Sequence, residues 1–351
     1  MNFAKFALAP LSLIYGAVTH LRARAYRQGI LKPHRLDGTV ISVGNLTVGG
    51  TGKTPMVFWI ADRLASEGKS VGILTRGYRG RPNGSREAAD AASSVSTSDE
   101  VRMLQSRLGE RIAFGVGPDR YANGVRLAKR GVNWLVLDDG FQHLQLARDV
   151  DIVLIDATNP FGGGRLLPAG RLRESCSALA RADMVVITRS NYVPAIEATV
   201  RRETDASIYY ARPKLEAIRS FTDGQLAGNV APSELGPLFA FCAIGNPQAF
   251  VADLRAWGLE IAGHRFFPDH HRFTDEDDEE VLCEARAAAA AGLICTEKDL
   301  YNLHAIHYGK MPIFYCAISM HIDREHEFWN EVLAIAKSRA EASRLKLQMT
   351  K

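Results

Sequence analysis

The stretch VISVGNLTVGGTGKTP (residues 40–55) constrains the fold more than any other part of the sequence. A short apolar run rich in β-branched residues leads into glycines, and the apolar helical pattern PMVFWIADRLASEG begins within its last two residues. This is the strand–loop–helix order of a phosphate-binding loop, whose pattern is G-x-x-x-x-G-K-[ST]. Counting back from Lys53, the opening glycine position holds Thr47. The stretch is therefore either a nucleotide site with a variant loop or a purely structural turn, and its context favours the nucleotide site.

The chemistry of such a loop assigns a role to each residue type. Backbone N–H groups from Gly49 to Lys53 can point at phosphate oxygens, at the positive end of the following helix. Lys53 would reach the β- and γ-phosphates, and the Thr54 hydroxyl would bind Mg²⁺. Pro55 is compatible with the first helical turn, where a backbone N–H has no partner.

Continuous apolar runs separated by helical stretches predict the architecture. Runs without polar alternation indicate strands covered on both faces, as in a parallel sheet. We therefore expect an α/β fold with a doubly wound, mainly parallel P-loop NTPase-like sheet. The expected strands are Thr39–Asn45, Val71–Thr75, Arg111–Gly115, Asn133–Asp139, Asp151–Asp156 and Ala182–Thr188.

The length of 351 residues favours two domains. The pattern changes to alternating, more polar segments around Ser207–Ile218, and a second α/β set follows, with strands at Pro237–Gly245 and Gly292–Asp299. Thr274 is a suitable N-cap for the acidic run DEDDEE, which we read as helix-end chemistry and not as a metal site. The predicted parts are an N-terminal helical region (1–36), a P-loop core (37–210) and a smaller α/β domain ending in a helix (211–351).

Charge and cysteine content limit the functional classes. The net charge is +4, but six basic residues precede the first acidic residue, Asp37, so the remainder carries −2. This distribution disfavours nucleic acid binding. The five cysteines form no C-x-x-C pair, which disfavours a disulfide framework or a zinc site and suits a reducing cytosol. The apolar run from Phe6 to Val18 is too short to span a bilayer, and a buried helix and a helix lying on a membrane both remain open.

A second stretch, WLVLDDGFQH, supports the nucleotide site. It is an apolar strand ending in Asp138 and Asp139, where a Walker B carboxylate belongs, at the ligand edge of a parallel sheet. Two acids at a strand end could instead cap a turn, but the phosphate loop makes this alternative weaker. Gln142 and His143 follow directly and are expected to line the same crevice.

Phosphoryl transfer also requires cations and a group that orients the acceptor hydroxyl. The candidate base is Asp99, or a histidine of FPDHHRF. The two histidines, His270 and His271, have no third ligand at a spacing suited to a metal. Taken singly, each arginine candidate is more often a solvated side chain; the candidates are Arg76, Arg120, Arg171 and Arg173.

These motifs together resemble one family. SVGNLTVGGTGKTP, TRGYRG, SDE, LDDGFQH, LLPAGRLRE, FPDHHRF and TEKD occur in the order found in tetraacyldisaccharide 4′-kinases, the lipid A 4′-kinases of Gram-negative bacteria. The resemblance extends from the basic N-terminal region to about Asp299. A Thr or Ser at the first loop position is typical of that family. Val101, Arg171 and Ser175 stand where the family usually has prolines.

The resemblance implies an ATP- and Mg²⁺-dependent kinase that phosphorylates the 4′-hydroxyl of a tetraacyl glucosamine disaccharide 1-phosphate to form lipid IVA. Asp138 and Asp139 would manage Mg²⁺, and Asp99, paired with His270 or alternatively His271, would orient the sugar hydroxyl. The ATP phosphates would lie on Val48, Gly49, Gly50, Thr51, Gly52, Lys53, Thr54 and Pro55. Positions matched near the phosphates or sugar are Arg76, Tyr78, Arg120, Gln142, His143, Arg173 and Glu174.

The resemblance also implies partners and a location. An acylated substrate is met at the bilayer, so the N-terminal helix is expected on the cytoplasmic face of the inner membrane, with no nucleic acid and no obligate protein partner. Two other classes remain: a P-loop ATPase or GTPase acting as a conformational switch on a membrane-bound partner, and a nucleotide-binding scaffold. Asp99, Asp138 and Asp139 argue against the scaffold, which needs no carboxylate for a hydroxyl.

Overall fold

The computed structural model describes residues 8–77, 99–222, 225–269, 271–303 and 311–349. The chain divides into two compact units, one comprising 1–212 with 321–351 and the other comprising 213–320. The chain passes between them inside two strands, β7 (Ser207–Thr222) and β12 (Ile313–Ile322). His270 and Tyr78 lie outside the described residues.

The first unit is a doubly wound α/β layer. Its strand order is β7-β6-β5-β1-β4-β2-β3, and the pairs from β7 to β3 are parallel. The expected α/β fold with a mainly parallel sheet is confirmed. The strands are β1 (Thr39–Asn45), β2 (Val71–Thr75), β3 (Ile112–Val116), β4 (Trp134–Asp138), β5 (Val150–Asp156) and β6 (Met184–Thr188).

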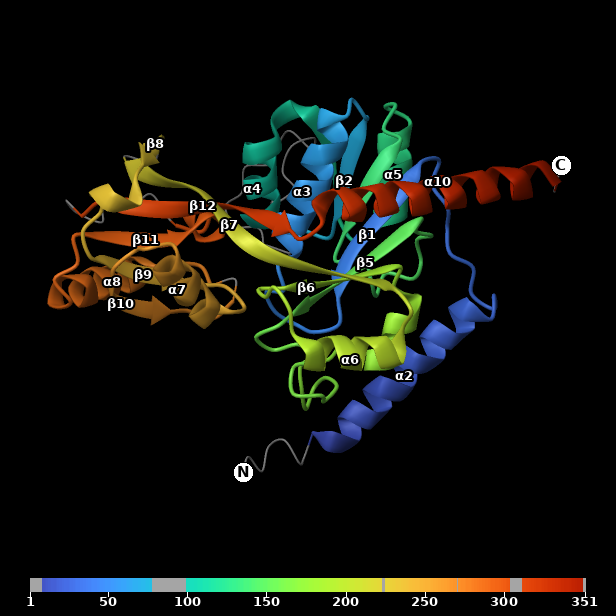
Figure 1. Ribbon diagram of the computed structural model, residues 1–351, viewed down its shortest axis with the longest axis horizontal. Helices are drawn as coiled ribbons and strands as arrows, with labels where there is room; N and C mark the ends of the chain where they lie inside the picture. Colours follow the sequence, from blue (N-terminus) through green and yellow to red (C-terminus); the bar gives the residue numbers. More distant parts are fainter. Residues whose placement is uncertain (1–7, 78–98, 223–224, 270, 304–310, 350–351) are drawn as a thin grey trace, which may run out of the picture. The chain divides into compact units, whose positions relative to one another are not determined.

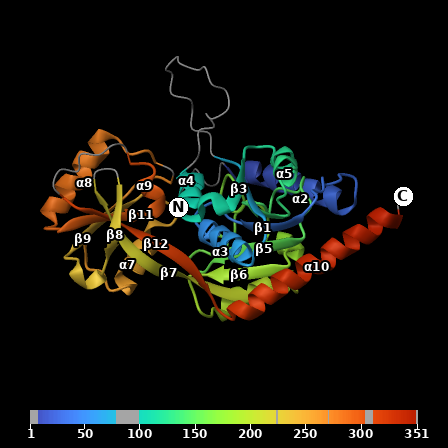
Figure 2. The ribbon, with the colours of Figure 1, turned by 90° about the horizontal axis from the view of Figure 1, so that it is seen from above.

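Helices cover both faces of this sheet. In Figure 2, α10 lies along one side of the strands, and α2 and α5 lie along the other. Helix α10 contacts β1 and β5. The helices of the first unit are α2 (Ala9–Arg27), α3 (Lys53–Ser66), α4 (Asp99–Leu108), α5 (Arg120–Ala128), α6 (Pro194–Glu203) and α10 (Glu325–Met349).

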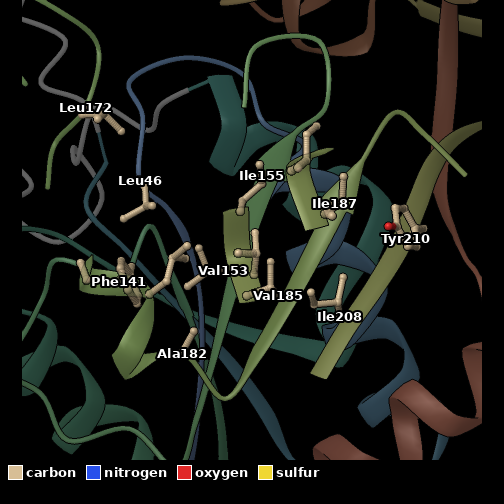
Figure 3. Packing of buried hydrophobic residues seen from close by; sticks show 14 residues of the cluster. Leu46, Phe141, Val153, Ile155, Leu172, Ala182, Val185, Ile187, Ile208 and Tyr210 are labelled. Atoms are coloured by element: carbon tan, nitrogen blue, oxygen red, sulfur yellow. The ribbon is translucent and has the colours of Figure 1, made fainter. Parts of the chain in front are cut away.

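Burial explains why the strand sequences lack alternation. Every residue of β2, β5 and β6 is buried. Figure 3 shows Val153 and Ile155 of β5 beside Val185 and Ile187 of β6, which belong to one apolar cluster with Phe141. A strand covered on both faces has no polar side to display, so its sequence is continuously apolar.

The last helix was expected in the C-terminal domain, but the structure groups residues 321–351 with the first unit. Its aromatic residues explain the difference. Trp329 and Phe328 pack edge-on against Trp59 of α3 at centroid distances of 5.6 Å. Burying two large aromatic side chains outweighs proximity along the sequence.

The second unit is a smaller α/β layer with parallel strand order β10-β9-β11-β12. Thr274 caps α8 in a capping box with Asp277, as the sequence predicted. Figures 1 and 2 together label these elements: β8 (Gln225–Val230), β9 (Leu238–Cys242), α7 (Pro247–Ala256), β10 (Ile261–Phe266), α8 (Asp275–Ala287), β11 (Gly292–Thr296) and α9 (Glu297–Leu300).

Helix α2 carries an exposed apolar stripe. Leu11, Ile14, Val18 and Leu21 recur on one side of the helix and are 52%, 62%, 59% and 63% exposed. The opposite side packs on the sheet unit through Ser12, whose hydroxyl donates to the Leu166 carbonyl at 3.1 Å. Within the described ranges, no helix is both long enough and apolar enough to cross a bilayer.

Candidate active site

The candidate site lies where the strand order of the first unit reverses. β1 is flanked by β4 on one side and β5 on the other. The sheet continues through β2 and β3 beyond β4, and through β6 and β7 beyond β5. The connections from β1 thus run in opposite directions, and the crevice at the carboxyl ends of β1 and β4 is a topological switch point. The glycine-rich loop and the Asp138–Asp139 pair both begin at this edge.

The loop conformation explains why Thr47 replaces the expected glycine. Thr47 is buried and forms an antiparallel bridge with Leu172. On either side of this bridge, the Arg173 N–H donates to the Leu46 carbonyl at 2.7 Å and the Val48 N–H donates to the Arg171 carbonyl at 2.8 Å. An extended, paired position accepts any side chain. The glycine requirement is met at Gly52, which precedes α3 with a φ of 87°.

The end of β1 holds the loop and its lysine together. The Asn45 side-chain amide donates to the Thr51 hydroxyl at 2.9 Å, and the Lys53 ammonium donates to the Asn45 side-chain oxygen at 3.3 Å. Lys53 also lies 3.6 Å from an Asp139 carboxylate oxygen. Sequence reasoning missed Asn45, the last residue of β1, because its role depends on the loop residues that lie opposite it.

The two aspartates after β4 differ in environment. Asp138 is buried and accepts a hydrogen bond from the Thr75 hydroxyl at 3.0 Å. Burial, together with the nearby charges of Glu100 and Asp139, raises the pKa of Asp138 to about 7. Glu100 and Thr75 are further residues of the site that the sequence did not single out.

Asp139 has the opposite shift. Burial alone would raise its pKa, but the charges and hydrogen bonds of Lys53 and Arg173 outweigh burial and lower the pKa of Asp139. Arg173 Nη1 donates to both Asp139 carboxylate oxygens at 2.7 Å. One carboxylate of the pair therefore stays ionised while the other gains a proton near neutral pH.

Gln142 and Glu174 lie beside these groups with defined partners. The Gln142 amide donates to the Asn45 carbonyl at 3.0 Å, and Arg173 donates to its side-chain oxygen at 3.4 Å. Glu174 is buried and accepts from Arg181 at 2.9 Å. Glu174 is thus held by a structural ion pair, whereas Gln142 lies between the end of β1 and Arg173.

The remaining candidate residues lie in different parts of the structure. Arg171 is exposed and donates to the Val48 carbonyl at 3.1 and 2.9 Å, so it supports the loop backbone. Arg76 is exposed, directly after β2. Asp99 is the first residue of α4. His271 belongs to the second unit, where its ring contacts Asp277 at 2.8 Å and stacks on Phe267 at 5.0 Å.

A Mg²⁺ ion fits the chemistry of these residues. Among the described residues, no group of three or more His, Cys, Asp or Glu side chains could hold a metal. Mg²⁺ in nucleotide enzymes needs only one or two carboxylates, because phosphates and waters supply the other ligands. The pKa of Asp138 is raised first by burial and then by the neighbouring acids, so its ionised form gains stability from a nearby cation.

The fold and this constellation define a P-loop nucleotide-binding phosphotransferase. Comparisons with known proteins give its family: residues 4–337 match the model of the tetraacyldisaccharide-1-P 4′-kinases (LpxK). The chain therefore belongs to the tetraacyldisaccharide-1-P 4′-kinase family, as its motifs predicted.

Individual relatives agree with this family. A tetraacyldisaccharide 4′-kinase of Anaeromyxobacter sp. (strain K) is 40% identical over 85% of this chain and 82% of its own length. One from Geobacter metallireducens is 38% identical over 89% and 92%. The crystal structure of LpxK from Aquifex aeolicus in complex with ATP matches with a TM-score of 0.68 and 27% identity, covering 95% of this chain and 99% of that chain.

Proposed function

We propose that this protein transfers the γ-phosphoryl group of Mg²⁺-bound ATP to the 4′-hydroxyl of a tetraacyl glucosamine disaccharide 1-phosphate, at the cytoplasmic face of the inner membrane. The observation that carries the proposal is the convergence of Lys53, Asp138, Asp139 and Arg173 at the switch point of a family member. The bound Mg²⁺ would neutralise charge on the phosphates. Thr54 and the aspartate pair are the residues suited to hold it.

In this proposal Lys53 exchanges its partners when ATP binds. Its contacts with Asn45 and Asp139 keep the ammonium at the mouth of the loop. Phosphate oxygens are stronger acceptors than an amide oxygen, so Lys53 turns to the β- and γ-phosphates. Arg173 then keeps Asp139 ionised after the lysine has left. The backbone from Val48 to Pro55 supplies the remaining phosphate contacts.

The acceptor hydroxyl is oriented by Asp99, with His270 as its partner. The contacts of the neighbouring histidine support this choice. His271 is bound to Asp277, which also caps α8 through the backbone and hydroxyl of Thr274. A ring engaged in a helix cap and stacked on an aromatic side chain is held for structural reasons. Asp99 would accept the hydroxyl proton as the phosphoryl group transfers in line.

Contact with the membrane is assigned to α2. Leu11, Ile14, Val18 and Leu21 expose a stripe that a soluble surface would not favour. Basic residues follow on the same helix at Arg24 and Arg27. An amphipathic helix with a cationic end suits an interfacial position on anionic lipid. The four acyl chains of the substrate would then remain in the bilayer during phosphorylation.

One experiment tests the transfer itself. The full-length protein is incubated in nonionic detergent with Mg²⁺, γ-labelled ATP and the tetraacyl disaccharide 1-phosphate, and the label on the lipid is measured. We expect lipid-dependent transfer. Label released as inorganic phosphate at the same rate with and without lipid would instead support the nucleotide-hydrolysing switch.

A further inference from the structure

Arg181 contacts both segments that carry the Arg173–Asp139 ion pair. It ends the short 3-10 helix that precedes β6, and its Nη2 donates to the Glu174 carboxylate at 2.9 Å. Its guanidinium carbon lies 4.5 Å from the centre of the Phe141 ring. Glu174 directly follows Arg173 in the sequence, whereas Phe141 belongs to the segment of Asp139. One side chain thus connects the two segments, and we call its two contacts the Arg181 brace.

The brace lies on the buried side of the ion pair. The side chains of Arg181 and Glu174 are 24% and 9% exposed, and Phe141 is fully buried. The Asp139 side chain, by contrast, is 35% exposed. Cation–π and ionic contacts away from water are screened less than exposed ones. A fixed Arg181 therefore restrains the two backbone segments beneath the crevice.

The guanidinium of Arg181 is not explained by packing alone. Among the described residues, two arginines bury an Nε that has no hydrogen-bond partner, Arg120 and Arg181. Burial lowers the pKa of Arg120 and the charges of Asp138 and Asp139 oppose this shift, so Arg120 belongs to the nucleotide crevice. Arg181 pairs with a buried carboxylate instead. Burying a donor without an acceptor costs free energy that an apolar side chain would avoid, so the contacts of the guanidinium must account for it.

The turn after β4 needs a restraint of this kind. Asp139 has a left-handed φ of 51°, which is unfavourable for a residue with a side chain and persists only where neighbouring contacts hold it. The Gly140 N–H donates to the Val43 carbonyl at 3.1 Å, and the His143 N–H donates to the Gly140 carbonyl at 2.8 Å. Phe141 lies between these hydrogen bonds, and its ring contacts the guanidinium of the brace. The brace thus helps to hold the turn that presents the Asp139 carboxylate.

Apolar packing does not by itself fix one segment relative to the other. Phe141 and Leu172, one from each segment, belong to the same buried cluster (Figure 3). Apolar contacts are non-directional and tolerate small shifts. The hydrogen bond to Glu174 and the contact with the ring each have a preferred geometry. Arg181 therefore supplies the directional contacts that the cluster lacks.

We propose that Arg181 is a positioning residue for phosphoryl transfer. Bound to Phe141 and Glu174, it keeps the two segments of the crevice ion pair in register. Without the brace, the guanidinium of Arg173 no longer meets both oxygens of the Asp139 carboxylate at once. The carboxylate then retains Lys53, which the phosphates require. The part of this inference that concerns transfer rests on the proposed function.

The first test measures kcat in nonionic micelles at saturating Mg²⁺-ATP and tetraacyl disaccharide 1-phosphate. Arg181→Met keeps an unbranched side chain beside the Phe141 ring and removes the charge. We expect kcat to fall about 10- to 100-fold with little change in the KM for ATP, as for a small misplacement remote from the chemistry. Arg201→Met is the matched control, because it removes the same charge from a surface pair with Glu197 in the same unit. Its kcat should stay within about twofold of the wild type.

A double variant separates positioning from general structural damage. If Arg181 acts through Arg173, it has nothing left to position once Arg173→Gln is in place. Adding Arg181→Met to Arg173→Gln should then lower kcat by less than about threefold in single-turnover measurements. Losses that multiply in the double variant would overturn the proposal, as would a wild-type kcat in Arg181→Met.

Arg181→Lys provides the same test if Arg181→Met does not fold. Lysine keeps a charge beside Glu174 but lacks the planar group that contacts the ring and the carboxylate together. Its kcat should fall less, by about three- to tenfold. This loss should also disappear when Arg181→Lys is added to Arg173→Gln, and a loss that persists there would overturn the proposal.

Hydrogen exchange of the intact protein gives a readout that needs no activity. In Arg181→Met, peptides that contain the hydrogen-bonded amides of Gly140 and Arg173 should exchange at least about threefold faster than in the wild type and in Arg201→Met. Peptides from β2 should not change. Unchanged exchange at Gly140 and Arg173 would overturn the brace.

The outcomes keep the two proposals apart. A wild type that labels no lipid contradicts the proposed function, and hydrogen exchange then decides whether Arg181 holds the two segments. A wild type that labels the lipid, with multiplying losses in the double variant, overturns the positioning role of Arg181 alone.

Discussion

Arg173 and Asp139 form the central ion pair of the site: Arg173 Nη1 donates to both carboxylate oxygens of Asp139 at 2.7 Å. Lys53 lies 3.6 Å from the same carboxylate, and the Asp139 backbone has a left-handed φ of 51°. The carboxylate is thus held between a fixed cation from the Leu166–Arg173 segment and a lysine that ATP requires. We expect this shared carboxylate to control when Lys53 is released.

Arg173→Gln should therefore lower kcat. Without the guanidinium, Asp139 retains Lys53, and the phosphates lose that cation in the transition state. Loss of one such group typically costs about 10²- to 10³-fold in rate. Steady-state kinetics with saturating lipid measures the change. Arg171→Gln is the control, because it breaks the contacts with the Val48 carbonyl and leaves the Arg173–Asp139 pair in place. An unchanged kcat in Arg173→Gln would exclude this role.

Asp138→Asn should stabilise the nucleotide-free protein. Because the pKa of Asp138 is raised to about 7 in the fold, the folded state binds more protons than the unfolded state between about pH 4 and 7. The wild type is therefore destabilised by this group as the pH rises through that window. At pH 8 we expect Asp138→Asn to raise Tm by roughly 3–8 °C. At pH 4 the difference should disappear; a difference independent of pH would contradict the assignment.

The same carboxyl predicts how Mg²⁺ dependence varies with pH. A cation displaces the proton of Asp138, so below its pKa of about 7 the apparent affinity for Mg²⁺ should fall by up to about tenfold per pH unit. Above this pKa the affinity should level off. Titration of activity with Mg²⁺ at fixed ATP between pH 6 and 8.5 measures the dependence. Asp138→Asn should abolish it, and a persistent slope would assign the proton to another group.

Asp99→Ala and His270→Ala should lower kcat much more than they change the KM for ATP, because both are assigned to the acceptor hydroxyl. A loss of about 10²- to 10⁴-fold is typical of a general base. His271→Ala is the matched neighbour. It breaks the contact with Asp277 and should lower the free energy of unfolding by about 1–2 kcal/mol. Its effect on kcat should be smaller than that of His270→Ala. A larger loss of kcat in His271→Ala than in His270→Ala would assign the catalytic role to His271.

The apolar stripe of α2 should control vesicle binding. Replacing Ile14, Val18 and Leu21 with serine removes side chains that are already exposed, so Tm should change little. At about 0.8 kcal/mol per buried CH₂, co-sedimentation with anionic vesicles should fall at least tenfold. Tyr192→Ser, at an exposed aromatic outside α2, is the control. If the triple variant and the wild type bind vesicles equally, α2 does not contact the membrane through this stripe and has only a structural role.

Much of the site could be predicted from the sequence, because each of its parts is formed by consecutive residues. The run from Thr39 to Thr54 contains a strand, a loop and the helix start within a few residues, and each is specified by its own composition. Asp138 was readable for the same reason, since an acid at the end of an apolar parallel strand faces the ligand edge. The family motifs added the acceptor chemistry, which local patterns do not contain.

Asn45 and Thr75 were not singled out, because a polar residue at a strand end gains significance only from what lies opposite. The sequence of α10 likewise predicts a helix but does not show what the helix packs against. Its Phe328 and Trp329 contact Trp59 of α3, and this contact places α10 in the first unit.

The sequence by itself determined the strands, the phosphate loop and the family, because these follow from side-chain periodicity and from consecutive residues. Only the tertiary structure decided which charges meet. Arg173 and Asp139 are separated by 34 residues, and Arg22 and Gln142 by 120. Contacts over such separations depend on how the sheet and its covering helices pack, and that packing sets the opposite protonation of Asp138 and Asp139.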